Sequence, residues 1–266
     1  MEIEYTVLLF FTLLICASVG WMAQSKLHQR NVTRESVDSI RLLMGMLLTF
    51  SALVLGLLTS NAKQRFDGYN NDLSVFGADL LEIDHRLRNY GAEANDIRVR
   101  LRSYTAAAIA DTWPEETVPS GQYPRIRHTP DDSGLETTEL GDLLGDIDSR
   151  IEHLAPQDEF HRQIATILRD RMAQAIRQRW RLILSASSTM SWPFLVVLTF
   201  WLCIIFAIFG LTSPRSRLVY AVVVLSALSI ASPLYLILDY SDALTGLLKL
   251  SSSPMRATLS HMDRSN

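Results

Sequence analysis

The sequence predicts an all-α membrane protein with four transmembrane helices and a helical extramembrane bundle between the second and the third of them. Two observations carry this prediction: four long uncharged apolar runs, and a polar middle segment whose apolar residues recur every three or four positions. A helix needs roughly 20 apolar residues to cross a hydrocarbon core about 30 Å thick. Each of the four runs is therefore long enough for one crossing.

The first membrane segment, residues 1–62, contains two of these runs. Tyr5 to Ser25 and Leu42 to Ala62 carry no charged residue, which predicts transmembrane helices at about 5–25 and 42–62. In the second run, Ala52 and Gly56 form a small-x-x-x-small pair, which favours close packing against another helix.

The extramembrane domain, residues 63–188, opens with an apolar stripe. Its members follow one another at steps of three and four residues: Phe66, Tyr69, Leu73, Phe76, Leu80, Ile83, Leu87 and Tyr90. No proline separates this stripe from the second span, so a single helix is expected to leave the membrane and project from it. Gly91 is expected to end that helix in a left-handed conformation. The stripe is expected to pack within the chain; packing between neighbouring copies is the alternative.

Three further features organise this domain. The same spacing resumes at Ala94 and predicts a second helix up to Trp113, after which prolines predict an irregular loop at about 114–134. A short acidic helix is expected from Leu135 to Leu154. Pro156 then suits the first turn of a last long helix that carries Ile164, Met172 and Trp180.

The second membrane segment, residues 189–240, contains the other two uncharged runs. They predict transmembrane helices at about 191–212 and 218–239. Ser226, Ser229 and Ser232 share one face of the last span, where helix packing is favoured over a water path. Residues 241–266 are expected to form a juxtamembrane tail.

Enzyme chemistry finds no support in the sequence. Zinc-protease, nucleophile-elbow, phosphate-loop, dinucleotide and C-x-x-C motifs are absent, so we expect no enzyme, no cofactor and no metal. His153 and His161 flank Asp158 and Glu159, but a solvated turn explains this group better than a metal site does.

An acidic run between residues 131 and 148 raises the question of calcium. It contains the following carboxylates with no basic residue among them: Asp131, Asp132, Glu136, Glu139, Asp142, Asp146 and Asp148. Because the EF-hand spacing is absent, a solvated helix face is the simpler interpretation. The net acidic middle segment also argues against nucleic acid as a partner.

Basic residues near the membrane leave two interpretations open. Five arginines precede the third span: Arg169, Arg171, Arg177, Arg179 and Arg181. They could attract anionic lipid or direct anions towards a pore mouth, or they could pair with acids on neighbouring helices. The numbers of lysines and arginines that flank the spans are equal on the two sides of the membrane. The positive-inside rule therefore does not decide the orientation.

Two stretches of the chain resemble a known family. They are "GMLLTFSALVLGLLTSNAKQRFDGYNNDL", with "NYGAEANDIRVRLR" after it, and "PFLVVLTFWLCIIFAIFGLTSP", followed by "LILDYSDALTGLLKLSSSPMRATL". These stretches are similar to the bacterial bestrophin-like family of four-span membrane proteins. A turn after the fourth span matches the family pattern at Gly246, Leu247, Leu248, Lys249, Leu250, Ser251, Ser252 and Pro254. It departs from the pattern at Ser241, Ala243 and Leu244.

The resemblance implies kinship with bestrophins, which are anion channels assembled as rings of subunits with a cytoplasmic helical domain between spans two and three. It therefore implies a multi-pass protein of the bacterial inner membrane, a cytoplasmic middle domain, a lipid bilayer as partner and a homo-oligomer. The alternative is a membrane-anchored interaction or sensor module without transport activity. No protein partner can be named from the sequence.

If the chain is a channel, the second span is the expected pore lining. Its polar residues Thr49, Ser51, Thr59, Ser60 and Asn61 are the pore-lining candidates, and Lys63 and Arg65 are the candidates for charge at the pore mouth. Hydroxyl and amide groups can replace part of the water around an anion, and basic rings favour anions over cations. The apolar stretch between Leu47 and Leu58 would suit a hydrophobic gate.

Overall fold

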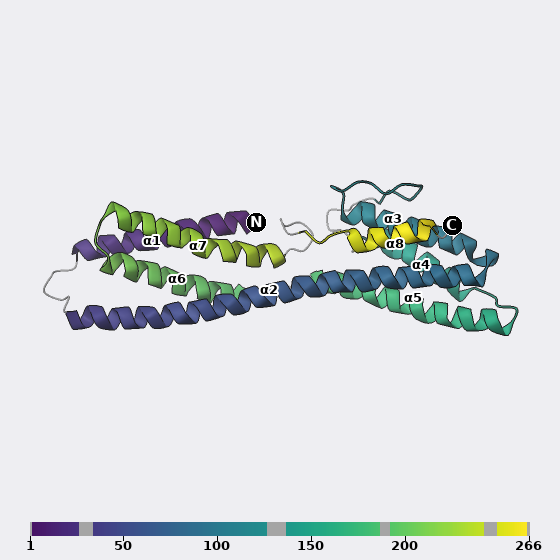
Figure 1. The fold of residues 1–266 in the computed structure, drawn as a ribbon, viewed down its shortest axis with the longest axis horizontal. Helices are drawn as coiled ribbons and strands as arrows, with labels where there is room; N and C mark the ends of the chain where they lie inside the picture. The colour runs from purple at the N-terminus through teal and green to yellow at the C-terminus, as the bar shows by residue number, and fades with distance from the viewer. Residues whose placement is uncertain (1, 27–33, 127–136, 187–191, 242–248, 265–266) are drawn as a thin grey trace. The chain divides into compact units, whose positions relative to one another are not determined.

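The computed structural model describes residues 2–26, 34–126, 137–186, 192–241 and 249–264 (Figure 1). These residues form helices joined by short irregular segments and contain no strand. Four of the helices are long and apolar enough to cross a membrane. The prediction of an all-α membrane protein is therefore confirmed.

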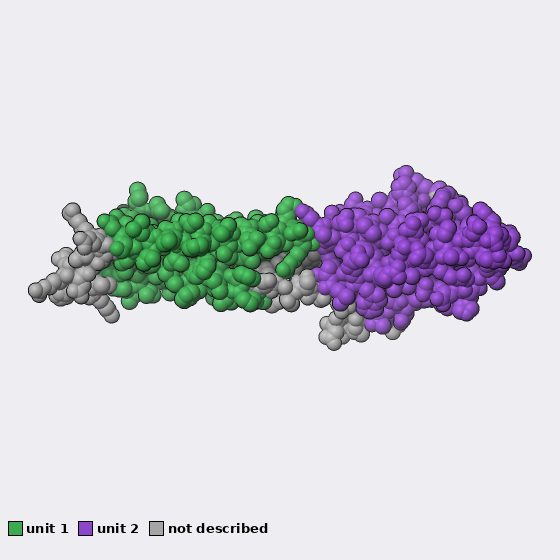
Figure 2. Space-filling model, turned by 90° about the horizontal axis from the view of Figure 1, so that it is seen from below, with its two compact units in different colours: residues 1–66, 189–242, 246–248 green, residues 67–188, 243–245, 249–266 purple. Residues whose placement is uncertain are grey.

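The chain divides into two compact units, which Figure 2 colours separately. Unit 1 comprises Met1–Phe66, Thr189–Asp242 and Gly246–Leu248, and unit 2 comprises Asp67–Ser188, Ala243–Thr245 and Lys249–Asn266. Each unit has its own hydrophobic core, so each is described by itself below.

Unit 1 contains the helices that can cross a membrane. They are α1 (Glu2–Lys26), the first part of α2 (Arg34–Tyr90), α6 (Trp192–Thr212) and α7 (Arg217–Ser241). Helix α1 packs against both α6 and α7. The shared core comprises Leu9, Leu13, Ala17 and Trp21 of α1, Leu58 and Ala62 of α2, Leu195, Leu198, Leu202 and Phe206 of α6, and Val223, Ala227, Leu234 and Ile237 of α7.

Two glycines bring α1 and α6 into backbone contact. A Cβ atom at Gly210 would lie 2.1 Å from the carbonyl oxygen of Ala17, and one at Gly20 would lie 2.1 Å from that of Ala207. Small residues of this kind let helices in a membrane approach closely enough for van der Waals packing to hold them together. Neither glycine belongs to a small-x-x-x-small pair predicted from the sequence.

Helix α2 is one uninterrupted helix of 57 residues, as the absence of proline predicted. It ends at Gly91, whose φ of 105° and ψ of −165° lie in a region that residues with a Cβ atom rarely adopt. The predicted stop at Gly91 is therefore confirmed. The expected left-handed helical conformation is not, because ψ lies far from the value of that region.

Unit 2 is a bundle built around the second part of α2. The other helices are α3 (Asn95–Thr112), α4 (Thr138–Glu152), α5 (Glu159–Ala186) and α8 (Ser253–Arg264), and the short 3-10 turn η2 (Ala92–Ala94) precedes α3. Helix α5 runs antiparallel to α2, because Gln178 bonds Asp72, Arg171 pairs with Glu82, and His161 contacts the carbonyl oxygen of Tyr90.

The predicted apolar stripe forms the core of unit 2. Leu73, Phe76, Leu80, Ile83 and Leu87 of α2 have no exposed surface within the single chain, and Met172 of α5 is equally buried. The interpretation that the stripe packs within the chain is thus confirmed for these residues. Phe66 is the exception, because it is half-buried and its ring contacts Tyr240, 5.3 Å away between centroids.

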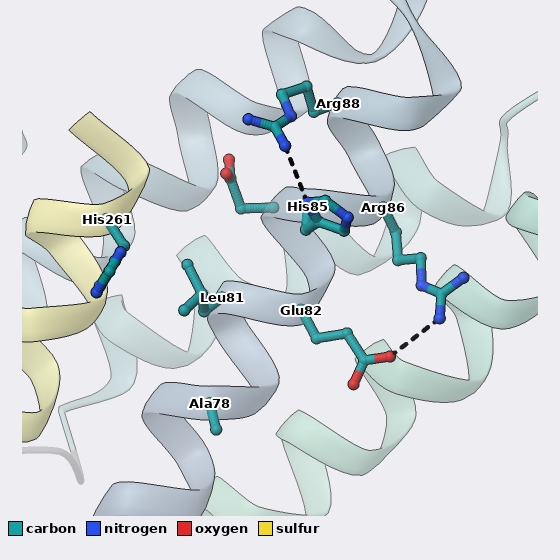
Figure 3. A pocket seen from close by; sticks show the side chains of 8 residues that line it. Ala78, Leu81, Glu82, His85, Arg86, Arg88 and His261 are labelled. Carbon is teal, nitrogen blue, oxygen red and sulfur yellow. Dashed lines mark hydrogen bonds and ion pairs between the residues drawn. The ribbon is translucent and has the colours of Figure 1, made fainter. Parts of the chain in front are cut away.

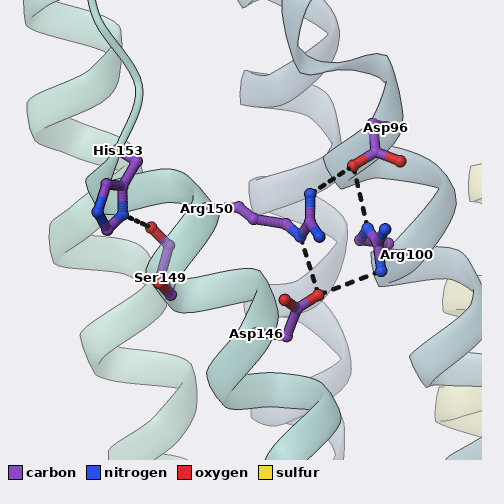
Figure 4. A network of polar contacts seen from close by, with 6 residues as sticks. All are labelled: Asp96, Arg100, Asp146, Ser149, Arg150 and His153. Carbon is purple, nitrogen blue, oxygen red and sulfur yellow. Dashed lines mark hydrogen bonds and ion pairs between the residues drawn. The ribbon is translucent and has the colours of Figure 1, made fainter.

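Polar contacts join the helices of unit 2 around this core. Asp84 and Arg98 form a nearly buried ion pair of 3.0 Å between α2 and α3. Figure 4 shows a second set, in which Arg100 and Arg150 each pair with both Asp96 and Asp146 and so connect α3 with α4. The surface ion pairs contribute little individually, but the network fixes how α4 lies along α3.

The C-terminal tail is more structured than the sequence analysis expected. Residues predicted as a juxtamembrane tail form α8, which packs against α3 as part of unit 2. Met255, Leu259 and Met262 are its buried apolar residues, and their spacing of four and three is the signal that could have identified the helix. Pro156, which was expected in the first turn of the last long helix, lies before that helix, because α5 begins at Glu159. The predicted domain boundaries stay predictions.

The core role of the α2 stripe can be tested at Leu80. Replacing Leu80 with alanine removes a fully buried side chain and should lower the free energy of unfolding by about 2–5 kcal/mol. Val75→Ala is the matched control, because Val75 lies on the same helix and is 41% exposed. Both variants should be melted in detergent with helicity as the signal. Unchanged stability of Leu80→Ala together with dissociation of an oligomer would contradict the core role.

Candidate functional site

The membrane part of α2 is the least buried of the four candidate spans. Only 11% of its most apolar window is buried within the chain, against 28% for α1, 33% for α6 and 28% for α7. The buried residues of this part of α2 are Ser51, Leu58 and Ala62, which follow one another at seven and four residues. The opposite side of the helix is therefore open in a single copy of the chain.

This open side, which we call the α2 face, consists of residues at steps of three, four and seven, so they share one side of a helix. It comprises Leu42, Gly45, Thr49, Leu53, Gly56, Ser60 and Lys63, all of which are exposed. A Cβ atom at Gly45 or at Gly56 would meet no other atom within 4 Å. The face thus combines small, hydroxyl-bearing and apolar residues and ends in a positive charge.

The α2 face divides the predicted pore-lining residues. Thr49 and Ser60 lie on it, whereas Ser51 lies on the opposite side of the helix and is 3% exposed. Thr59, which is half-buried, and Asn61, which is exposed, lie on the flanks. The prediction from the sequence treated these residues as one group because it considered only their polarity, and a single helix cannot turn all of them to one side.

The hydroxyl groups on α2 differ in what they can offer a ligand. Thr49 donates its hydroxyl hydrogen to the carbonyl oxygen of Gly45 at 2.9 Å, and Thr59 donates to that of Leu55 at 2.8 Å. A hydroxyl group has one hydrogen to donate. These two threonines therefore present mainly acceptor oxygens, and donors for an anion must come from Ser60, Asn61 or Lys63.

The two predicted pore-mouth charges also separate. Lys63 follows Ser60 by three residues and lies on the α2 face, whereas Arg65 lies two residues further and so points roughly to the opposite side. Both side chains are exposed. Only Lys63 shares a side of the helix with Thr49 and Ser60.

The expected packing role of Ala52 and Gly56 is wrong within the single chain. Both residues are exposed, and among the described residues no atom lies within 4 Å of a Cβ atom placed at Gly56. The close helix contact in unit 1 is made by Gly20 and Gly210 instead. The small residues of α2 are therefore left for a contact outside the single chain or for an open space.

The turn that matches the family pattern lies partly within the described residues. Gly246 and Leu247 lie outside them, as do Leu248 and the departures Ala243 and Leu244. The described part forms a series of contacts with the segment after α3: Lys249 pairs with Glu115, Ser252 donates a hydrogen bond to Glu116, and Trp113 donates its indole N–H to the carbonyl oxygen of Leu250 at 2.7 Å.

The first turn of α8 completes this set of contacts, which we call the tail latch. Arg256 bonds both the carboxylate of Glu116 at 2.9 Å and the carbonyl oxygen of Thr117 at 2.7 Å. The exposed Ser251 accepts a hydrogen bond from the N–H of Ser253 at 3.2 Å, and Pro254 occupies the first turn of the helix. The turn therefore acts as a fastening between the tail and unit 2.

Helix α8 also touches α2 directly. Thr258 donates its hydroxyl hydrogen to the carbonyl oxygen of Gly77 at 3.0 Å, and a Cβ atom at Gly77 would lie 2.8 Å from that hydroxyl oxygen. A side chain at position 77 would thus push α8 away from α2. This glycine is required by the close approach of two helices, and the sequence analysis did not identify it.

A surface pocket of about 500 Å³ lies between α2 and α8 in unit 2 (Figure 3). Its residues are Ala78, Leu81, Glu82, Asp84, His85, Arg86, Arg88 and His261. Its charged groups are largely engaged with one another or with neighbours: Arg86 and Arg171 pair with Glu82, Arg98 pairs with Asp84, and Arg88 bonds His85 at 3.1 Å. We assign no ligand to this pocket.

The metal and calcium alternatives gain no support from the described residues, in which no group of three or more histidines, cysteines or carboxylates could hold a metal ion. His161 bonds Asp158 at 2.8 Å and lies 3.1 Å from the carbonyl oxygen of Tyr90, so it fastens the start of α5 to the end of α2. In the acidic run, Asp146 pairs with arginines, and Asp131, Asp132 and Glu136 lie outside the described residues.

A family model described as a bestrophin-like domain matches residues 10–255 of the chain. No curated protein matches it. The matched range includes most of the first candidate span, the other three spans in full, and nearly all of unit 2.

Solved structures of a bacterial bestrophin homologue from Klebsiella pneumoniae have the same fold. One crystal structure, solved with zinc phasing, superposes with a TM-score of 0.60 at 16% identity over 99% of this chain and 96% of that one. Two mutants of the homologue give TM-scores of 0.62, at 16% identity over 99% and 98% of the two chains, and at 13% identity over 99% and 96%. At this identity the likeness shows the fold alone.

The tail latch predicts a dependence of α8 on pH. The hydrogen bond from Ser252 and the guanidinium of Arg256 hold the pKa of Glu116 below its ordinary value. The latch is therefore complete above the ordinary carboxyl pKa and is lost as the pH falls through the lowered pKa of Glu116. Hydrogen exchange across residues 253–264, corrected for intrinsic rates, should show α8 losing protection in acid.

The variant Glu116→Gln should give weaker protection of α8 already at neutral pH and should lack the acid step. Glu159→Gln is the matched control, because Glu159 pairs with Arg162 at the start of α5 and does not contact α8. If α8 in Glu116→Gln kept the protection and the acid step of the unmodified chain, Glu116 would not be the group that fastens it.

Proposed function

The chain belongs to the bestrophin-like family, and from that premise we propose that it assembles into an oligomeric anion channel in the bacterial inner membrane. Bestrophins, the relatives implied by this membership, are anion channels built as rings of subunits. The observation that supports the proposal is the exposure of the α2 face. Helix α2 is the longest helix, yet this side of it is open in a single copy of the chain.

In a ring of copies, each α2 helix would lie between two neighbouring subunits, and the ring would enclose a centre. Closed symmetric rings repeat one contact until it returns to its start, and the centre of such a ring can be a pore. If α2 lies nearest the centre, the small residues Gly45 and Gly56 leave room for ions and water between the copies. Thr49 and Ser60 would then repeat around the pore as rings of hydroxyl oxygens.

The order of residues along the α2 face supports a gate followed by a charged mouth. Leu53 lies between Thr49 and Gly56 and is 69% exposed in the single copy. A ring of such leucines would make a dry constriction that conducts only when it is wetted. The polar groups of Ser60 and Lys63 follow towards the end of the span. There they would replace part of the hydration water of an ion.

Selectivity for anions would rest mainly on Lys63. Because the hydroxyl hydrogen of Thr49 is used by the helix backbone, Thr49 presents acceptor oxygens that suit cations or water. Asp67 follows Lys63 by four residues on the same side of α2. The net field at the pore mouth is therefore the difference between a lysine ring and an aspartate ring, and removing Lys63 should have a large effect.

The alternative from another class is a membrane-anchored interaction or sensor module. Its support is the pocket between α2 and α8 in unit 2, which is open at the surface of the single chain. Such a module needs no ring and no ion flux, so reconstitution of the purified chain separates the two functions.

The channel proposal predicts a difference between two neighbouring basic residues. The chain in lipid vesicles should pass chloride, and Lys63→Glu should lower chloride flux at least about tenfold or make the flux cation-selective, because two acidic rings would then repel anions. Arg65→Glu is the matched control with the same change of charge, and it should keep most of the chloride flux. Flux should be followed with a chloride-sensitive dye under a potassium gradient.

Two results would count against this assignment. Equal effects of Lys63→Glu and Arg65→Glu would show that general surface charge matters and that the α2 face does not line the pore. If the folded chain showed no flux of any ion and a mass in mild detergent that corresponds to one or two copies, the interaction module would be favoured.

For orientation, we propose that both termini and unit 2 are cytoplasmic, as the family relationship implies, although the flanking charges tie. A reporter enzyme that is active only in the periplasm should remain silent when fused after Asn266. The same reporter inserted at residue 30, in the first short linker, should be active. The reverse pattern would place unit 2 outside the cytoplasm.

A further inference from the structure

The five arginines of α5 that precede the third span have different roles in the structure. Arg169 donates to the carbonyl oxygens of Glu152 and Leu154, at 3.1 and 3.4 Å. Arg171 pairs with Glu82 at 3.2 Å, and the buried Arg179 donates to the carbonyl oxygen of Thr137 at 3.1 Å. These three side chains fasten the helices of unit 2 to one another. The interpretation that the arginines pair with neighbouring acids is confirmed for Arg171, whereas Arg169 and Arg179 donate to backbone carbonyl oxygens.

The remaining two arginines lie together on an exposed face of α5. Arg177, Trp180, Arg181 and Leu184 follow one another at steps of three, one and three residues, so they share one side of the helix. All four are exposed; Trp180 is 54% and Leu184 is 66% accessible. We call this group the Arg–Trp patch. In the part of the chain that the structure describes, no ion pair engages Arg177 or Arg181.

Trp180 is positioned by the fixed arginine next to it. The guanidinium carbon of Arg179 lies 5.8 Å from the centroid of the indole ring, within the range of a cation–π contact. Because Arg179 is itself buried and bonded to Thr137, it supports the ring from the protein side. A large aromatic side chain is thus held at the surface, and Arg177 and Arg181 lie three residues before it and one residue after it on the same exposed face.

The position of the patch along the chain suits the edge of a bilayer. Leu184 precedes Trp192, the first residue of the candidate span α6, by only eight residues. The patch therefore lies close in sequence to the point where the chain enters the hydrocarbon core, and the headgroup layer extends roughly 5–8 Å beyond that core.

The chemistry of the patch fits that layer. Tryptophan is enriched where hydrocarbon meets headgroups, and arginine forms two parallel hydrogen bonds to a phosphate group. The α5 helix ends at Ala186, and the candidate span α6 begins at Trp192, so the chain itself continues from the patch into the membrane. An anionic lipid surface is therefore the partner that both the charge and the chain path favour.

We propose that the Arg–Trp patch binds the phosphate-bearing headgroups of anionic phospholipids, with Trp180 inserted at the level of the headgroups and Arg177 and Arg181 on either side of a phosphate. This site goes beyond the channel function and does not depend on it, since the patch uses none of the residues of the α2 face. Its effect is to hold α5 against one leaflet.

The test uses the full-length protein in vesicles with lipids brominated on their acyl chains, which quench nearby tryptophans. The signal of Trp180 is the difference between the unmodified chain and Trp180→Phe, because the chain has five tryptophans. Brominated phosphatidylglycerol should quench Trp180 at a lower mole fraction than brominated phosphatidylcholine does. In phosphatidylcholine vesicles, added inorganic phosphate should leave this quenching unchanged.

Variants at the two arginines test the charge. Arg177→Gln with Arg181→Gln should raise the mole fraction of phosphatidylglycerol needed for half-maximal quenching, by up to about fivefold for each arginine. The matched control is Arg88→Gln with Arg162→Gln, because both of these arginines are exposed in unit 2 at the ends of α2 and α5 that lie furthest from the spans. The control should keep the preference for phosphatidylglycerol.

Several outcomes would overturn the proposal. Equal quenching by the two lipids would show that the charge of the headgroup plays no role. An equal loss of the preference for phosphatidylglycerol in the control variant would show a non-specific effect of surface charge. No quenching of Trp180 by either lipid would mean that another copy of the chain or another part of the protein covers the patch. Suppression of the quenching by inorganic phosphate, beyond that caused by chloride at the same ionic strength, would assign the site to a soluble anion.

Discussion

The burial of α2 along one side only is the constraint on which the rest of the structure depends. From Ser51 to Leu87 the buried residues of this helix follow one line, and the opposite side stays exposed. A helix buries a stripe when a partner covers that stripe, and its other face then needs solvent, lipid or another chain. In unit 2, water can solvate the polar exposed side. In unit 1, the exposed side carries glycine, threonine, serine and lysine, whose polar groups lipid solvates poorly.

That asymmetry connects the two functions considered for the chain. A channel needs a surface that several copies can turn towards a common centre, and the α2 face combines low burial with polar groups. Helices α1, α6 and α7 supply most of the core of unit 1, helped by the backbone contact at Gly20 and Gly210. They can therefore form a stable support while α2 remains available to neighbours.

The contacts of unit 2 gather on α2 as well. Helix α8 meets it at Gly77, α5 meets it through Glu82 and Asp72, and α3 meets it through the buried ion pair of Asp84 with Arg98. A change in the latch at Glu116 or a lipid bound at the Arg–Trp patch would thus act on helices that touch α2 directly.

The sequence by itself determined the class of the fold and the course of its longest helix. Uncharged runs of sufficient length require membrane helices, because backbone groups without hydrogen bonds are too costly in lipid. The steps of three and four from Tyr69 to Leu87 identified the buried stripe of unit 2. Tertiary structure decided which side of α2 is covered. Helical spacing alone puts Thr49 and Ser51 on opposite sides, but only the core of unit 1 shows that Ser51 is buried and that the side with Thr49, Ser60 and Lys63 stays exposed. The roles of Gly77, Glu116 and the five arginines of α5 likewise depend on partners that are distant in the chain, which local spacing cannot reveal.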